Sequence, residues 1–196
     1  MPSEDAVRWN SRYLDESGHP TRSPNLLLTE NKNLLTSGGL ALDIAMGLGV
    51  NAGFLLRNGL RVIGVDISYA AVYQAKHEAP GLMAVVVDLE DFFIPPGAFD
   101  VILDLLYLQR TLWVPMVNGL KVGGILLVEC LTMDMLGHHP DINPSYLLNA
   151  GELHQAFHSR PLSDKLEILH SAEGWYQSAA SHRRASARLI ARRIGQ

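Results

Sequence analysis

A glycine-rich turn followed by an acidic residue is the part of the sequence with the most readable chemistry. The stretch GLGVNA, residues 47–52, matches G-x-G-x-x-G/A, and Asp66 follows Gly47 by about twenty positions. Glycines let the backbone turn sharply and approach a ligand, and the N-terminus of a following helix offers unpaired N–H groups. An acid at the end of the next strand can accept hydrogen bonds from ribose hydroxyls. The pattern therefore predicts a site for a nucleotide-type ligand.

Asp43, in the otherwise apolar stretch LDIAMGLG, helps to identify that ligand. A dinucleotide would place its dianionic pyrophosphate against the turn, where a nearby carboxylate would repel it by about 1 kcal/mol or more in a partly dry crevice. A cofactor with a cationic sulfonium and an ammonium group would instead be attracted, and S-adenosylmethionine (SAM) is such a cofactor. Asp43 therefore favours SAM over NAD.

The elements that must position these residues alternate between strands and helices. Strands are predicted over 39–44, 61–66, 82–87, 99–103 and 124–130, and helices over 24–35, 50–58, 69–79 and 109–120. The alternation is typical of a wound α/β fold with a parallel sheet. Two further strand-like runs, 165–171 and 184–194, have no helix between them, so they should pair as antiparallel neighbours.

Three details of these elements can be checked directly. Ser23 is expected to cap the helix over 24–35. The near-continuous apolar run 82–87 is expected to be buried on both faces. In the last run, arginines alternate with apolar residues, which is typical of a strand with one solvated face.

The composition limits the classes of function. The chain has 196 residues, enough for one domain, and its net charge of −4 argues against nucleic acid as a partner. No apolar run is long enough to span a membrane, and the start of the chain has no pattern of a secretory signal. The single cysteine, Cys130, fits a reducing compartment and a small buried side chain. A cytoplasmic protein that binds neither membrane nor nucleic acid is expected, and its oligomeric state is left open.

Several motifs together resemble a known family. LDIAMGLG, VIGVDIS and VVVDLED, in this order and spacing, resemble the first motifs of class I SAM-dependent methyltransferases. RWNSRY, SPNLLLTENKNLL, YLQRTLW and NPSYLLNAGEL resemble the small methyltransferases of the tellurite-resistance type. The resemblance covers essentially the whole chain. It implies one Rossmann-like, doubly wound domain over 1–196, with residues 1–36 as a helical cap over the cofactor. Its mostly parallel, seven-stranded α/β sheet would end in an antiparallel C-terminal hairpin strand.

The resemblance also implies which residues hold the methionine part of SAM. Asp43 would do so together with the backbone of Ala45, Gly47 and Gly49. Asp104, at the end of the fourth strand, would lie by the methionine end, close to the transferred methyl group. The family usually has glycine and cysteine before Gly47, where this chain has Ala45 and Met46. A side chain at position 45 could crowd the turn.

For the rest of the cofactor, the resemblance assigns two acidic residues and their neighbours. Asp66 would bind the ribose hydroxyls, with Ile67 against the adenine. Asp88 would bind the adenine amino group, with the backbone of Leu89 nearby.

Aromatic and basic side chains would complete the pocket. Trp9 and Tyr13 would cover the cofactor from the N-terminal helix. For the methyl acceptor, the candidates are Tyr107 and Arg110, together with the segment 132–148. Arg110 could bind an anionic acceptor or brace the following helix.

No catalytic acid or base is identified, and none is required. Methyl transfer is a displacement at carbon, so holding the reacting atoms in line can lower the barrier by about 7–11 kcal/mol. The histidine pairs 138/139 and 154/158 lack the spacing of a complete ligand set, so no metal is expected. The absence of an N/D-P-P-Y/F motif near Asp104 disfavours methylation of nucleic-acid bases.

The predicted function is transfer of the methyl group of SAM to a small-molecule nucleophile, with S-adenosylhomocysteine (SAH) as product. The resemblance suggests a thiol or a tellurite- or selenite-type acceptor. Two alternatives stay open at this point: an NAD-dependent oxidoreductase, and a SAM-binding sensor or scaffold without catalysis.

Overall fold

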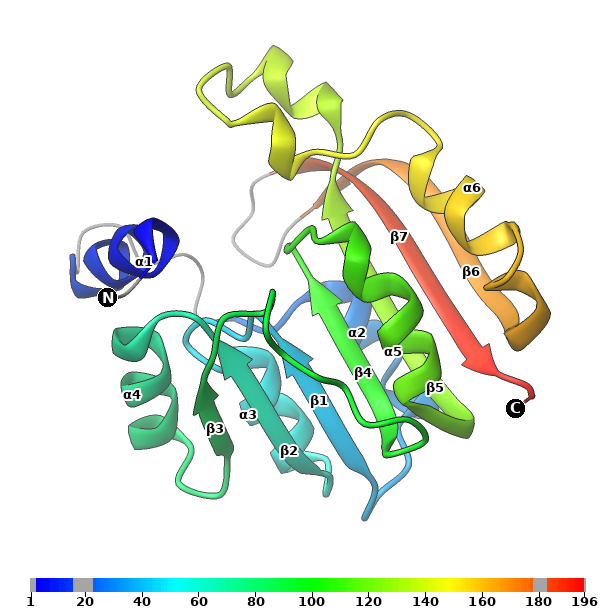
Figure 1. Cartoon of the computed structure of the whole chain (residues 1–196), viewed down its shortest axis with the longest axis horizontal. Coiled ribbons are helices and arrows are strands. Elements are labelled where there is room, and N and C mark those ends of the chain that lie inside the picture. Colours follow the sequence, from blue (N-terminus) through cyan, green and yellow to red (C-terminus); the bar gives the residue numbers. More distant parts are fainter. Residues whose placement is uncertain (1–2, 16–22, 178–182, 196) are drawn as a thin grey trace.

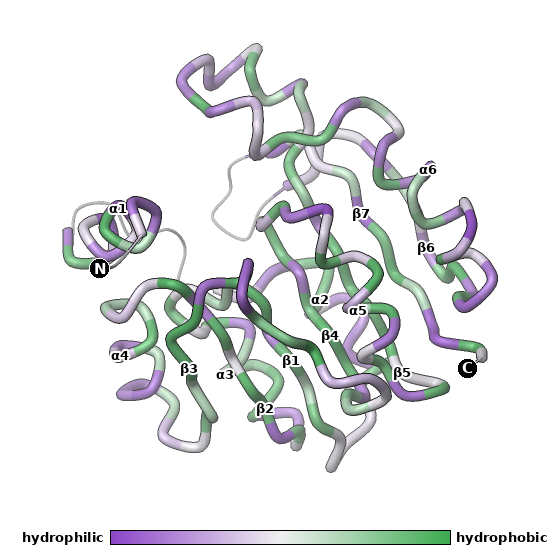
Figure 2. Tube along the Cα trace, in the orientation of Figure 1, coloured by the Kyte–Doolittle hydropathy of each residue, from purple (hydrophilic) through white to green (hydrophobic). Residues whose placement is uncertain are grey.

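One seven-stranded sheet forms the centre of the computed structural model, which describes residues 3–15, 23–177 and 183–195 (Figure 1). The strand order is β3-β2-β1-β4-β5-β7-β6. The strands are β1 (Leu40–Ile44), β2 (Arg61–Asp66), β3 (Met83–Val86), β4 (Phe99–Leu105), β5 (Leu120–Leu131), β6 (Leu166–Gln177) and β7 (Arg183–Arg193). Much of β1, β4 and β5 is hydrophobic (Figure 2), as expected of strands covered on both faces.

The directions of the strands confirm the predicted fold class. β3, β2, β1, β4 and β5 are parallel neighbours, whereas β7 is antiparallel to both β5 and β6. The sheet is therefore mostly parallel and ends in the antiparallel hairpin expected from the two C-terminal runs.

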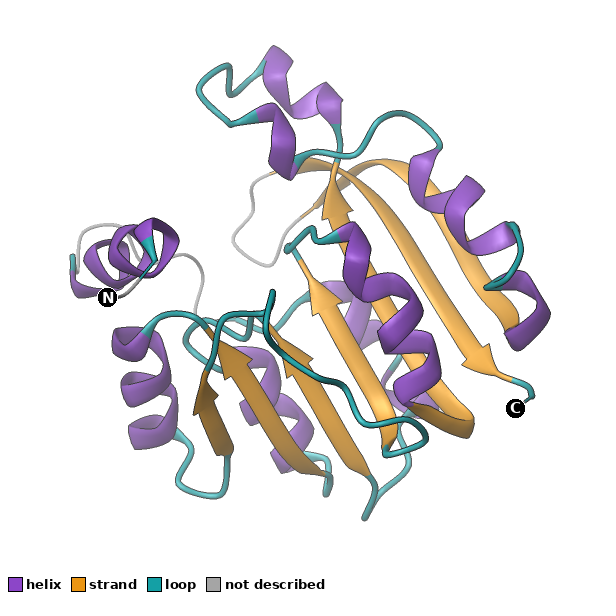
Figure 3. Ribbon diagram, in the orientation of Figure 1, coloured by secondary structure: helices purple, strands orange, loops and turns teal. Residues whose placement is uncertain are grey.

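Helices lie on both faces of the sheet (Figure 3). The α-helices are α1 (Glu4–Leu14), α2 (Leu26–Glu30), α3 (Val50–Arg57), α4 (Tyr69–Glu78), α5 (Trp113–Gly119) and α6 (Glu152–His158). Short 3-10 helices are η2 (Lys32–Leu34), η3 (Arg110–Leu112), η4 (Met133–Gly137), η5 (Pro144–Tyr146) and η6 (Ser163–Lys165). No helix within the described ranges is long and apolar enough to cross a membrane.

Two hydrophobic cores result from the alternation of side chains along the strands. In β1, Leu42 and Ile44 pack in the core that includes Trp113 of α5 and Phe157 of α6. Ala41, on the opposite face, packs in the core formed with α2, α3 and α4. This period of two places successive residues of a strand on different faces, so each face needs its own layer of helices.

The prediction that residues 82–87 form a strand buried on both faces is wrong. β3 is the edge strand of the sheet, and Met83, Val85 and Val86 are 43%, 44% and 46% exposed. An apolar run alone does not distinguish an edge strand from a central one, because its neighbours decide how much of it is covered.

Two other details also differ from expectation. β7 has no solvated face along most of its length: it lies between β5 and β6, and Arg188 is buried in an ion pair with Glu129. α2 begins after Asn25 rather than Ser23, because the Asn25 side chain accepts a hydrogen bond from the Leu27 N–H. It ends at Glu30, and the predicted helix continues only as the short η2.

Candidate functional site

A pocket of about 900 Å³ opens at the carboxyl ends of the parallel strands. Its walls come from the segments that follow β1, β2, β3 and β4, from the end of β5, from β6 and β7, and from α1. Ligands of open α/β sheets bind at this edge, because the loops that leave the strands there form a crevice. A volume of this size is within the range of pockets for small molecules.

The glycine-rich turn after β1 forms part of this wall. Ala45, Gly47 and Gly49 all have positive φ angles, of 49°, 53° and 70°. A Cβ atom added at Gly47 would lie 2.6 Å from the hydroxyl oxygen of Tyr13, so the turn and α1 approach too closely for a side chain here. Gly49 does not line the pocket; a Cβ atom there would lie 2.8 Å from the Cβ of Ala75 in α4.

Asp66 connects the turn to the next helix. Its Oδ2 accepts a hydrogen bond from the Gly47 N–H and its Oδ1 accepts one from the Ser68 N–H, both at 2.8 Å. Burial raises the pKa of the Asp66 carboxyl, and these two backbone hydrogen bonds oppose the rise. Asp66 and the adjacent Ile67 both line the pocket.

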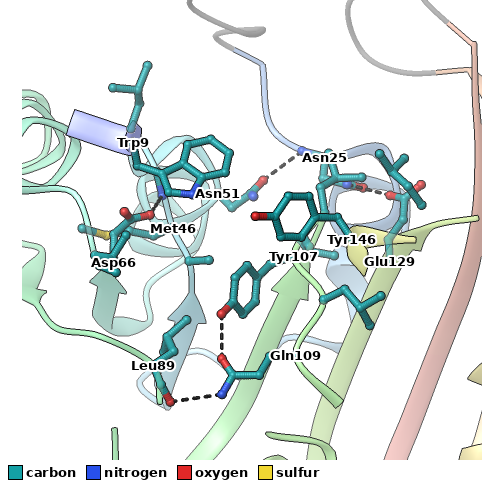
Figure 4. A pocket seen from close by; sticks show the side chains of 18 of the residues that line it. Trp9, Asn25, Met46, Asn51, Asp66, Leu89, Tyr107, Gln109, Glu129 and Tyr146 are labelled. Atoms are coloured by element: carbon teal, nitrogen blue, oxygen red, sulfur yellow. Dashed lines mark hydrogen bonds between the residues drawn. The ribbon is translucent and has the colours of Figure 1, made fainter. Parts of the chain in front are cut away.

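The segment after β3 forms the neighbouring part of the wall. Asp88 and Leu89 line the pocket, and Asp88 Oδ1 accepts a hydrogen bond from the Glu90 N–H at 3.1 Å. Gln109 donates to the Leu89 carbonyl at 3.4 Å and accepts a hydrogen bond from the Tyr107 hydroxyl at 2.6 Å (Figure 4). Tyr107 is thereby held in a fixed position in the pocket.

Asp43 and Asp104 do not line the pocket, although both are almost completely buried near it. The Asp43 carboxylate accepts a hydrogen bond from the Ala52 N–H in the first turn of α3, and burial raises its pKa to about 7. Neither carboxylate oxygen of Asp104 has a hydrogen-bond partner within the described ranges. Burial is the main cause, and the charge of the nearby Asp43 the second, of a pKa of Asp104 well above its ordinary value.

α1 covers one side of the pocket. Trp9 and Tyr13 stack with their ring centroids 6.0 Å apart, and both line the pocket. Asn10 fixes the helix to the start of α4, because its Oδ1 accepts hydrogen bonds from the Ser68 hydroxyl and the Ala70 N–H, each at 3.0 Å. Burial, with a smaller contribution from Asp66, raises the pKa of Tyr13 to about 12.

Arg110 is outside the pocket lining and braces α6. Its guanidinium forms an ion pair with Glu152 and also donates to the Leu147 carbonyl at 3.3 Å. Its contacts are thus with α6 and Leu147 rather than with the helix that directly follows it, and binding of an anionic acceptor stays a prediction.

The sequence did not predict a network of hydrogen-bonded polar side chains in the pocket. Figure 4 shows the part of this network that joins Asn51, Asn25 and Glu129. The Asn25 N–H donates to Asn51 Oδ1 at 2.9 Å, and Asn25 Nδ2 donates to Glu129 Oε2 at 2.6 Å. Glu129 Oε1 accepts from Ser186 at 2.7 Å and from Arg188 at 3.0 Å. A signal was present, since Glu129 interrupts the apolar strand ILLVECL just as Asp43 interrupts its own strand.

The histidines and the cysteine are further candidate ligands or nucleophiles. Among the described residues, no group of three or more His, Cys, Asp or Glu side chains could hold a metal ion. His154 and His158 stack on each other with centroids 3.7 Å apart. The buried Cys130 thiol donates to the Tyr107 carbonyl at 2.9 Å.

A comparison with protein families identifies the central part of the chain. Residues 42–128 match the family described as "Methyltransferase domain". No curated protein sequence matches the chain.

Solved structures give a likeness over more of the chain. One such structure is of a protein studied for the conversion of a disulfide bond into a thioacetal group during echinomycin biosynthesis. It aligns with a TM-score of 0.72 at 19% identity, over 97% of this chain and 94% of that one. Geranyl diphosphate C-methyltransferase from Streptomyces coelicolor A3(2), solved with SAH, aligns with a TM-score of 0.63 at 15% identity, over 86% and 79% of the two chains. TehB from Haemophilus influenzae aligns with a TM-score of 0.64 at 17% identity, over 85% and 61%.

These comparisons confirm part of what the sequence predicts. The structural likeness confirms the Rossmann-like fold of SAM-dependent methyltransferases. The family match over residues 42–128, together with this likeness, supports a methyltransferase that uses SAM as its cofactor. The tellurite-resistance subgroup is supported only by the weak likeness to TehB, so it stays a prediction.

Proposed function

We propose that this methyltransferase domain transfers the methyl group of SAM to a small-molecule nucleophile and releases SAH. The reacting domain would comprise residues 1–196, and the N-terminal segment 1–36 would cover the cofactor. A cytoplasmic location without a membrane or nucleic-acid partner stays a prediction.

The observation that carries this proposal is the acidic character of the pocket around the glycine-rich turn. Five acidic residues line that half against two arginines of α1, and Asp43 is buried next to it; the acidic residues are Glu4, Asp5, Asp66, Asp88 and Glu90, and the arginines are Arg8 and Arg12. Carboxylates favour a cationic sulfonium and an ammonium group over a dianionic pyrophosphate at short range. This charge distribution, together with the family match, supports SAM over the nicotinamide dinucleotide considered as an alternative.

The residues around the pocket suggest how each part of SAM would be bound. The backbone of Ala45 and Gly47 would face the methionine part, and the Asp66 carboxylate would accept hydrogen bonds from the ribose hydroxyls. Ile67 would pack against the adenine, with Asp88 and the Leu89 backbone near its amino group.

Asp43, Gly49 and Asp104 would act on this site indirectly, because they do not line the pocket. Asp43 would hold the start of α3 through Ala52, and Gly49 would allow α3 and α4 to pack closely. Burial beside Asp43 raises the pKa of the Asp104 carboxyl well above its ordinary value.

Positioning accounts for the chemistry that these residues can perform. Bound SAM supplies a methyl group activated by its sulfonium. Trp9 and Tyr13 would cover the cofactor and exclude water, and Tyr107, fixed by Gln109, would contact the acceptor. Alignment of this kind can lower a barrier by about 7–11 kcal/mol without covalent participation of a side chain.

The identity of the acceptor rests on resemblance. A thiol or a tellurite- or selenite-type oxyanion is the acceptor proposed. The likeness to a protein that converts a disulfide and to TehB is compatible with such soft nucleophiles.

Calorimetric titration with SAM, SAH and NADH tests the cofactor. We expect micromolar binding of the two adenosyl compounds and none of NADH. Asp66→Asn should weaken SAM binding at least tenfold, because it removes the charge that receives the ribose hydroxyls, about 1.5–3 kcal/mol per charged hydrogen bond. Asp164→Asn, a change in an exposed ion pair on η6, is the matched control and should bind SAM normally.

Turnover distinguishes an enzyme from a SAM-binding scaffold. Release of SAH should be measured with SAM and a panel of small thiols, selenite and tellurite. Tight binding of SAM without SAH release on any acceptor would favour the sensor or scaffold, and binding of NADH alone would contradict the proposal.

A further inference from the structure

The wall of the pocket opposite the acidic half is formed by β5, β6 and β7. β-Strand register places Glu129 opposite Arg188, and Arg184 opposite Tyr176. Arg184 and Arg188 are four residues apart in one strand, so their side chains share a face of the sheet. All four residues line the pocket.

Arg188 is held rigidly in this wall. It is only 8% exposed, its Nε donates to Glu129 Oε1 at 3.0 Å, and its Cζ atom lies 3.7 Å from the centroid of the Tyr176 ring. Its terminal guanidinium nitrogens have no hydrogen-bond partner among the residues of the three described ranges. A buried arginine with unpaired N–H groups at a pocket wall is a preorganised donor for an oxyanion.

Arg184 gives this half of the pocket its net charge. Glu129 neutralises Arg188, and Glu129 itself is fully occupied by donors from Asn25, Ser186 and Arg188. Arg184 is half-buried and forms no ion pair within the described part of the chain. The pocket is therefore acidic beside β1, β2 and β3 and basic beside β7.

The position of β7 in the sheet sets how far this wall lies from the cofactor. β5 separates β7 from β4, and β4 separates β5 from β1. Neighbouring strands are about 4.8 Å apart, so β7 lies about 10 Å from β4 and about 14 Å from β1. The Arg188 guanidinium contacts Glu129 on β5 through its Nε and lies over the Tyr176 ring on β6. An oxyanion held by Arg184 and Arg188 would therefore lie on the side of the pocket away from the glycine-rich turn.

We propose that the acceptor is an organic acid of several ångströms in length. Its carboxylate or phosphate binds Arg184 and Arg188, and a separate nucleophilic atom reaches the methyl group of SAM. For a thiol nucleophile, the sulfur loses its proton to water and forms a bond to the methyl carbon, while the carbon–sulfonium bond breaks and its electrons stay on the sulfur of SAH. This proposal rests on the methyl transfer proposed above and disfavours bare tellurite or selenite as the acceptor.

Calorimetry on the SAH complex provides the test. The probes are 3-phenylpropionate and phenyl phosphate as the two kinds of anion, 3-phenylpropanamide as a neutral analogue and 3-phenylpropylamine as a cation. We expect at least one anion to bind at least tenfold more tightly than the amide, and the amine to bind most weakly. Comparison of the two anions tells whether a carboxylate or a phosphate is preferred.

Variants assign the preference to the two arginines. Arg184→Gln should weaken anion binding at least tenfold and leave SAH affinity unchanged. Because Arg188→Gln leaves Glu129 buried without its ion pair, the double variant Glu129→Gln/Arg188→Gln removes both charges together and should show the same loss. Arg192→Gln is the control on the same strand, since Arg192 pairs with Glu167 and is absent from the pocket lining.

The outcomes separate this inference from the proposed function. Equal or undetectable binding of the anions and the amide in the presence of bound SAH would overturn the inference, as would unchanged anion binding by Arg184→Gln. Failure of the protein to bind SAH at all would contradict the methyltransferase function itself.

Discussion

Acidic side chains lie at or near the ends of four neighbouring strands of the sheet, and their hydrogen-bond partners differ. Asp66 accepts two backbone hydrogen bonds, which oppose the rise in its pKa caused by burial, and Glu129 accepts three hydrogen bonds from side chains. Asp43 accepts one from Ala52, and Asp104 accepts none from the described residues. Burial therefore raises the pKa of Asp43 and of Asp104.

The raised pKa of Asp43 predicts a pH dependence of stability. The carboxyl has an ordinary pKa of 3.8 and a pKa of about 7 in the folded protein. Between these pH values, Asp43 binds more protons in the folded state than in the unfolded state. The contribution of Asp43 to the free energy of unfolding therefore falls as the pH rises through this window and levels off above it. Asp43→Asn does not titrate, and we expect its free energy of unfolding relative to the parent to rise by about 1–4 kcal/mol across the window.

Urea denaturation at several pH values between about pH 4 and pH 8 measures this difference. Asp164→Asn, in an exposed pair, should parallel the parent protein. A constant difference between Asp43→Asn and its parent at every pH would contradict the raised pKa.

A second prediction at the scale of single residues concerns the effect of Gly47→Ala on SAM binding. In Gly47→Ala, the alanine would have to adopt the positive φ of Gly47, and its Cβ atom would lie 2.6 Å from the Tyr13 hydroxyl oxygen. We therefore expect α1 to shift and SAM to bind at least tenfold more weakly. Gly97→Ala is a matched control, because Gly97 also has a positive φ of 63° but has no atom within 4 Å of the added carbon. Only the general cost of the left-handed conformation, about 1 kcal/mol, should appear there.

The variant Gly47→Ala/Tyr13→Phe identifies the cause of that loss. Without the hydroxyl, the nearest atom of residue 13 would be its ring carbon at 3.4 Å from the added Cβ. We expect SAM binding, measured by calorimetry, to recover relative to Gly47→Ala alone. No recovery would show that α1 does not lie against the turn.

At the scale of elements, Asn25 joins parts of the chain that are far apart in sequence. It caps α2, donates to Glu129 at the end of β5, and binds Asn51 in α3. Asn25→Ala removes the cap and leaves one acceptor of the buried Glu129 unpaired, so we expect the free energy of unfolding to fall by about 2–3 kcal/mol. Urea denaturation should show no comparable loss for Asn33→Ala, which changes an exposed residue of η2.

The sequence predicts most of these elements because local signals agree with the final fold. Alternating apolar segments and turn residues give the parallel strands, and the missing crossover helix gives the antiparallel hairpin. The exposure of β3 and the burial of β7 depend on which strands flank them, and this information lies outside the two segments themselves.

Some residues of the candidate site, like some features of the fold, could be predicted from the sequence, and others could not. The turn around Gly47, Asp66 and the segment at Asp88 follow their strands directly, so their meeting at one sheet edge could be expected. Asn25 and Arg188 reach the pocket only through tertiary packing of segments that are remote in sequence. Likewise, the sequence indicates an acidic residue at position 104, but its distance from the pocket lining depends on side-chain direction.

On the scale of the whole molecule, the pocket is lined by residues from the N-terminal, central and C-terminal parts of the described chain. Residues of α1 line the acidic half, and residues of β6 and β7 line the basic half. Figure 1 shows α1 and the β6–β7 hairpin on opposite sides of the fold. Opposite charges at the two sides of one pocket suit a cationic cofactor and an anionic acceptor, which would also attract each other across it.

The insertion of β7 between β5 and β6 has a consequence for how the protein is made. β6 leaves the ribosome before β7, yet it has no partner in the sheet until β7 arrives. During synthesis the edge of β5 is therefore unpaired and open to non-native contacts. The strands that flank the acidic half of the pocket all precede β6 in the chain, whereas the basic half is completed only when β7 pairs with β5.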